Sequence, residues 1–141
     1  MSNPMPTWEI HNALARLAHL ADSGDIDEYL QQFTEDAVWE VPEVPQTGTK
    51  ADRRSGRADI RDGVVSRRAR GIQGPGSATQ HVVHTIEVLP GADGTATSHT
   101  YYAFYTNTTT APALVAVGQY HDTWKLADGG WKLAHRRIVS G

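Results

Sequence analysis

The architecture follows first from residues 79–107, which read TQHVVHTIEVLPGADGTATSHTYYAFYTN. This segment holds two runs rich in β-branched and aromatic residues, 79–89 and 96–107, on either side of the turn sequence PGADG. Such a pattern is typical of a β-hairpin. Two similar runs, 114–126 and 131–139, follow after short connections. The C-terminal half therefore predicts four strands in an antiparallel meander.

The N-terminal part has the periodicity of helices. Apolar residues recur at three- and four-residue steps over residues 7–21 and predict an amphipathic helix. Asp25, with Glu28 three residues later, forms a capping box that predicts a second helix over residues 26–33. A third helix is predicted over residues 57–70, before a segment rich in Gly and Pro.

Between these helices, residues 37–41 predict a short strand, and residues 42–54 predict a loop with at most a short edge strand. Helices that precede a sheet are typical of the α+β class. We therefore expect a cone-shaped, curved antiparallel sheet wrapped around the N-terminal helices, with a pocket inside. The whole chain, residues 1–141, is expected to form a single domain.

Composition narrows the chemistry that the chain can perform. The chain has no cysteine, which excludes disulfides, thiolate metal sites and cysteine nucleophiles. A net charge of -3 argues against nucleic acid as the main partner. No run of about 18 apolar residues occurs, and the first residues have no signal-peptide character, so we expect a cytoplasmic protein without a membrane span.

Asp22 and His81 are the strongest candidates for catalysis. Asp22 lies on or beside the apolar stripe of the first helix, where a charge is unexpected, and an acid near a helix C-terminus is disfavoured unless it has a partner. A histidine could be the partner of this carboxylate, and His81 stands at the start of the first long predicted strand. An imidazole backed by a carboxylate is a general base that needs no cofactor. The alternative is that Asp22 points to solvent.

Strand parity decides where the histidines face. If His81 faces inward, Thr85 does too and His84 faces outward, so the His81–His84 pair is not expected to bind a metal. One hairpin register places His81 opposite Tyr102, and His84 opposite His99 on the outer face. A one-residue slip would bring His99 inward as a second imidazole across the substrate.

Aromatic residues supply candidates for the pocket wall. Tyr29, Trp39, Tyr102 and Tyr120 could hold a small hydrophobic substrate, although packing in the core explains each of them alone. Eight of the thirteen Lys and Arg residues fall within residues 50–70. They form either a solvated surface or an electropositive rim that attracts an anionic substrate.

Several stretches resemble a known family. They are AHLADSGD (18–25), FTEDAVW (33–39), GRADIR (56–61), TQHVV (79–83), GQYHD (118–122) and GWKL (130–133). Together they are similar to the SnoaL-like branch of the nuclear transport factor 2-like superfamily, which includes scytalone dehydratase, ketosteroid isomerase and polyketide cyclase relatives. The resemblance implies a cone-shaped α+β barrel, commonly assembled as a homodimer or homotrimer through the outer sheet face.

The resemblance also implies roles for particular residues. In the dehydratase-like members, an aspartate late in the first helix and a histidine at the start of this strand form the catalytic pair, and Asp22 and His81 match them. Many relatives have an asparagine four residues after the histidine. This chain has Thr85 there, which we expect to contact the substrate.

These observations predict a cofactor-independent lyase or isomerase that acts on a hydrophobic, carbonyl-bearing or cyclic small molecule through general acid and base chemistry. No metal is expected. The alternatives are a non-catalytic protein that binds a small molecule in the same pocket, and an accessory subunit that uses the outer sheet face.

Overall fold

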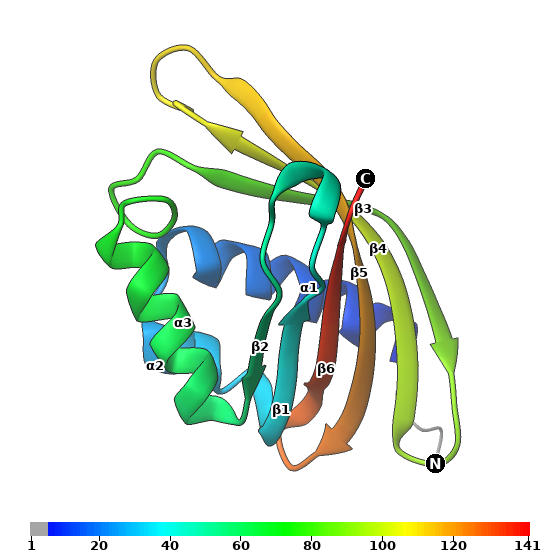
Figure 1. The fold of residues 1–141 in the computed structure, drawn as a ribbon. Coiled ribbons are helices and arrows are strands. Elements are labelled where there is room, and N and C mark those ends of the chain that lie inside the picture. Colours follow the sequence, from blue (N-terminus) through cyan, green and yellow to red (C-terminus); the bar gives the residue numbers. More distant parts are fainter. Residues whose placement is uncertain (1–5) are drawn as a thin grey trace.

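The computed structural model describes residues 6–141, which form three α-helices and one six-stranded sheet (Figure 1). The helices are α1 (Pro6–Ser23), α2 (Ile26–Leu30) and α3 (Arg57–Ala69). The strands are β1 (Phe33–Val41), β2 (Asp52–Ser55), β3 (Gln80–Pro90), β4 (Thr95–Thr106), β5 (Ala113–Ala127) and β6 (Gly130–Ser140). Within the described residues, no helix has the length and apolar character needed to cross a membrane.

The sheet confirms the α+β prediction and adds one parallel pair to it. Its strand order is β2-β1-β6-β5-β4-β3, and strands β3 to β6 form the expected antiparallel meander. Strand β1 pairs in parallel with β6 and antiparallel with β2, so the sheet is mixed rather than wholly antiparallel. A parallel pair needs a long crossover, and the chain from β2 to β5 provides it.

The helices cover the concave face of the curved sheet, and α1 crosses that face while α2 and α3 close one end (Figure 1). The stripe of α1 predicted to be apolar is buried, with Ile10, Leu14 and Leu17 at most 2% exposed. They share a core with Trp124 of β5 and Leu133 of β6, both fully buried. Each such side chain contributes about 1.5–3 kcal/mol through burial.

The second helix and the first strand differ from their predicted bounds. Helix α2 ends at Leu30, and β1 begins at Phe33 rather than at residue 37. Phe33 is fully buried and packs edge-on against Tyr29, with ring centroids 5.2 Å apart. Burial of this aromatic ring in the sheet therefore ends the helix early. Asp25 caps α2 as expected, because its carboxylate accepts a hydrogen bond from the Glu28 amide at 3.1 Å.

The predicted hairpin register is wrong from the turn onward, where Pro90 pairs with Ala96, and a bulge in β3 shifts the pairing once more. His81 lies opposite Phe104 rather than Tyr102, and His84 lies opposite Tyr101 rather than His99. The pairing then shifts between His84 and Glu87, where Thr85 has a positive φ of 55°. One extra residue in a strand reverses the facing of every residue beyond it.

Candidate functional site

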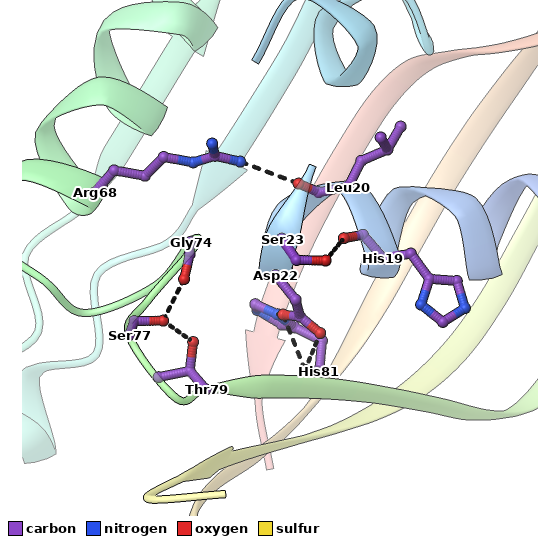
Figure 2. A network of polar contacts seen from close by, with 9 residues as sticks. All are labelled: His19, Leu20, Asp22, Ser23, Arg68, Gly74, Ser77, Thr79 and His81. Carbon is purple, nitrogen blue, oxygen red and sulfur yellow. Dashed lines mark hydrogen bonds and ion pairs between the residues drawn. The ribbon is translucent and has the colours of Figure 1, made fainter. Parts of the chain in front are cut away.

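Asp22 at the end of α1 and His81 at the start of β3 lie in direct contact (Figure 2). The Nδ1 atom of His81 is 2.7 Å from Oδ1 of Asp22. The backbone N–H of His81 donates to the same carboxylate, at 3.0 Å to Oδ2 and 3.2 Å to Oδ1. The two side chains are largely withdrawn from solvent, with 14% of Asp22 and 17% of His81 exposed.

Helix α3 holds the end of α1 that carries Asp22. The guanidinium of Arg68 donates to the carbonyl oxygens of Leu20 at 3.0 Å and Gly24 at 2.8 Å. These carbonyls lie at the negative end of the α1 dipole, so a cation there offsets the cost of placing an aspartate beside them. Figure 2 shows Arg68 reaching across to Leu20. The unexpected acid therefore has two stabilising partners, an imidazole and a guanidinium.

The loop before β3 fixes the approach of His81. The Ser77 hydroxyl donates to the Gly74 carbonyl at 2.6 Å and lies 2.7 Å from the Thr79 hydroxyl (Figure 2). Gly74 has a φ of +94°, and a Cβ there would lie 2.8 Å from the side chain of Arg68. Only glycine fits this close approach. The same arginine that caps α1 therefore also supports the loop that leads to His81.

The contact with Asp22 determines what the imidazole can do. A carboxylate accepts hydrogen bonds, so it favours the tautomer that carries hydrogen on Nδ1 and leaves the lone pair on Nε2. The ring also packs against Phe104, with centroids 4.6 Å apart, which limits its rotation. Such an imidazole can take a proton at Nε2 while the carboxylate stabilises the resulting cation.

His81 lines a cavity of about 100 Å³ between the helices and the concave face of the sheet. Its apolar walls are Leu14, Leu17, Ala18, Ala21, Val83 and Ile138, and its other lining residues are Tyr29, Trp39, Arg67, Gln73, Tyr120 and Arg136. Sites for drug-sized ligands measure about 300–1,000 Å³. This cavity therefore fits a compact molecule, or the reacting end of a larger one.

A buried ion pair behind the cavity was not predicted from the sequence. Arg136 of β6 donates two hydrogen bonds, both of 2.9 Å, to the carboxylate of Asp122 on β5. The side chains are 6% and 0% exposed. The Arg136 guanidinium also lies 3.8 Å from the ring centroid of Tyr120. A signal existed in the sequence, because alternation places Asp122 between Tyr120 and Trp124 on the inward face of its strand.

The tyrosines predicted to bind substrate divide into two groups. Tyr29 and Tyr120 line the cavity, whereas Tyr102 lies behind Tyr120 and stacks on it at 4.5 Å between ring centroids. Tyr102 also covers Gly118, where a Cβ would lie 2.6 Å from its ring. Burial raises the pKa of all three phenols, and Arg136 only partly opposes this. Tyr29 and Tyr120 therefore line the cavity as protonated phenols.

Two other predicted site residues lie away from the cavity. Thr85 sits exposed in the bulge with its hydroxyl 2.9 Å from Nδ1 of His84, so the expectation that it faces inward is wrong. The imidazole of His99 stacks on that of His121 at 4.4 Å, and its Nε2 lies 2.6 Å from Gln119. His99 alternates with the buried Ser98 and Thr100, which places it on the outer face.

The basic segment 50–70 is neither wholly solvated nor a continuous rim. Arg53 pairs with Glu40, Arg54 with Asp52 and Asp59, and Arg61 with Asp27. Arg67 is different, because it lines the cavity and lies over the Trp39 ring, 4.6 Å from the ring centroid. Burial lowers the pKa of Arg67, although a guanidinium stays charged at neutral pH.

Known proteins share this architecture. The family model for the SnoaL-like domain matches residues 7–137. An NTF2-like protein with a cystatin-like fold from Novosphingobium aromaticivorans superposes with a TM-score of 0.80 at 21% identity, over 96% of this chain and 81% of that one. A search of curated proteins finds no match.

Two further structures from Novosphingobium aromaticivorans DSM 12444 carry names that suggest functions. A candidate scytalone dehydratase has a TM-score of 0.70 at 21% identity, over 96% of this chain and 83% of that one. The beta subunit of a candidate aromatic-ring-hydroxylating dioxygenase has a TM-score of 0.73 at 14% identity, over 94% of this chain and 87% of that one. At these identities the likeness extends to the fold alone.

Proposed function

The chain belongs to the SnoaL-like family, and on that premise we propose that it is a lyase or isomerase in which His81 and Asp22 move a proton without a cofactor. The observation that carries this proposal is the 2.7 Å contact between the His81 ring and the Asp22 carboxylate, at the wall of a cavity. The substrate is a small hydrophobic molecule that bears a carbonyl group or a ring.

The proposed reaction begins with proton abstraction. Nε2 of His81 takes the proton from a carbon next to the substrate carbonyl, and the C–H electron pair moves into an enolate. Asp22 stabilises the imidazolium that forms. In an isomerase the proton returns to another carbon of the same molecule. In a dehydratase the enolate electrons expel a β-hydroxyl group, which takes the proton from the imidazolium and leaves as water.

The enolate oxygen needs a hydrogen-bond donor. Tyr29 and Tyr120 line the same cavity as His81, and no side chain or backbone group of residues 6–141 hydrogen-bonds to either hydroxyl. Because burial raises the pKa of both phenols, each keeps its proton at neutral pH and is available as a donor. A preorganised donor at a developing oxyanion contributes about 2.7–4 kcal/mol of transition-state stabilisation in well-studied cases.

A carbon-acid exchange assay tests the proposal on a panel of candidate substrates. Compact β-hydroxy ketones and cyclic enones are incubated with the protein in D₂O, and ¹H NMR follows loss of the α-proton signal or formation of the elimination product. His81→Gln should lower the rate about 10²–10⁴-fold, because general base catalysis contributes that much. His84→Gln is the matched control, since His84 lies on the same strand and faces outward. Equal rates for the wild type and His81→Gln would refute the proposal.

A second candidate function is an accessory subunit that uses the outer sheet face for assembly. The observation in its favour is a group of exposed apolar residues on β5, where Leu114, Val115 and Val117 are 56%, 58% and 51% exposed. Exposed apolar groups of this kind mark contacts with other chains. We propose that this face forms a homodimer or homotrimer. Light scattering of the wild type and Val117→Lys would test it, with a fall to monomer mass as the expected result.

A further inference from the structure

Arg67 is the cation in the cavity wall that lacks a counter-charge. Of the two arginines that line the cavity, Arg136 is neutralised by Asp122 through two hydrogen bonds. Arg67 forms no ion pair and donates no side-chain hydrogen bond to any residue in the described range, 6–141. Nearby Asp52 is already bonded to Arg54 at 2.8 Å.

The Trp39 ring accounts for the position of Arg67 but not for its donors. The guanidinium carbon lies 4.6 Å from the ring centroid, which is a cation–π contact. A contact with a ring face uses none of the five N–H groups around the edge of the guanidinium. The nitrogens of Arg67 are not fully buried, so their unused N–H groups stay open to a molecule that enters the cavity. The lowered pKa of Arg67 has partial burial as its main cause.

We propose that Arg67 is an anion-binding residue and that the molecule taken by this cavity carries a carboxylate, which the guanidinium of Arg67 holds. A carboxylate offers two coplanar oxygens that match the fork of a guanidinium. A cavity of about 100 Å³ leaves room for such a group on a short stem. Three acids near the site already have partners, since Asp22 is bonded to His81, Asp122 to Arg136 and Asp52 to Arg54.

The neighbours of Arg67 can complete the binding of an anion. Tyr29 lines the same cavity and is close enough for the charge of Arg67 to influence its pKa. Gln73 also lines the cavity, and its side-chain amide is a hydrogen-bond donor. Because His81 lines the same space, a molecule held at one end by Arg67 presents its carbon skeleton to the imidazole.

The claim that this carboxylic acid is the substrate rests on the proposed function, whereas the claim that the cavity binds a carboxylate does not. The class predicted is a short keto acid, with a carboxylate for Arg67 at one end and a ketone carbonyl that acidifies a neighbouring C–H bond, on an otherwise apolar skeleton. No charge is created or lost at the carboxylate during proton transfer, so Arg67 positions the molecule and does not exchange protons with it.

The test uses propanoate and its neutral isostere propanamide as probes. ¹⁵N–¹H NMR titration of the wild type follows the indole N–H of Trp39 and the Nε–H of Arg67. We expect saturable shifts of both signals with propanoate and at least tenfold weaker binding of propanamide. Equal dissociation constants for the two probes, or no propanoate binding at all, would overturn the proposal. This comparison needs no variant, so it is independent of any loss of stability.

Variants then locate the binding. Arg67→Gln should weaken propanoate binding at least tenfold, while Arg70→Gln, on the exposed end of the same helix, should leave it unchanged. If the two variants behaved alike, binding would reflect general surface charge and the proposal would fail. His81→Gln separates this proposal from the proposed function. It should bind propanoate like the wild type even though it loses proton exchange, and a loss of binding in that variant would contradict a carboxylate site centred on Arg67.

Discussion

Replacing Arg136 with methionine should destabilise the protein more than any exposed charge substitution. The change removes both 2.9 Å hydrogen bonds to Asp122 and leaves a carboxylate that is 0% exposed without a counter-charge. Breaking a buried ion pair in this way costs about 3–5 kcal/mol. That is a large share of a typical stability of about 5–15 kcal/mol.

Equilibrium urea unfolding measures this cost. With a denaturant slope of about 2 kcal/mol/M, the midpoint of Arg136→Met should fall by about 1.5–2.5 M. The matched control is Arg53→Gln, which breaks the 3.2 Å pair with Glu40, where Arg53 is 62% exposed. An exposed pair of this kind contributes about 0–1 kcal/mol. The double variant Asp122→Leu/Arg136→Met should recover most of the loss, because it leaves no unpaired charge in the core.

The result that would refute this reasoning is a loss below about 1 kcal/mol for Arg136→Met, equal to that of the exposed control. It would mean that Asp122 finds another donor or becomes protonated at little cost. A double variant as unstable as Arg136→Met alone would show instead that shape, rather than charge, dominates at this position.

Three other outcomes are expected. Asp22→Asn should lower proton exchange as strongly as His81→Gln and shift the His81 tautomer, which ¹⁵N chemical shifts of the ring would detect; an unchanged tautomer would argue against the role of the carboxylate. Tyr29, Tyr102 and Tyr120 have raised pKa values, so the unfolded state loses its phenol protons first and stability should fall above about pH 10, by up to about 1.4 kcal/mol per pH unit for each. Urea midpoints that stay constant from pH 9 to about pH 11 would contradict this. Gly118→Ala should displace the ring of Tyr102 and cost about 1–3 kcal/mol, measured by thermal unfolding; a variant that melts at the wild-type temperature would contradict this.

The sequence predicts the elements of this fold well because periodicity is a local property. The apolar stripe of α1 and the alternation of β3 were enough to expect that Asp22 and His81 approach each other, and the structure brings them into contact. The catalytic role of the pair stays a prediction. The parallel pairing of β1 with β6 joins strands from opposite ends of the chain, and no local sequence pattern predicts such a long-range pairing.

Register is the property that local patterns predicted least well. The bulge gives Thr85, a β-branched residue, a positive φ that is usually adopted by glycine. The residue type at this position therefore does not predict the bulge. Thr85 lies in the bulge itself and is exposed, and the residues beyond it change face. The inward position of Asp122 follows from the alternation of β5, but its pairing with Arg136 depends on the register between β5 and β6, which local patterns do not give.

Arg67 and Arg68 are neighbours on α3 with different tasks, since one side chain lines the cavity and the other grips the end of α1. One turn of α3 therefore contributes both to the wall of the cavity and to the position of Asp22. A shift or tilt of α3 would change both at once. Enlarging the cavity for a bulkier ligand by moving this helix therefore requires a second change that keeps Asp22 in place.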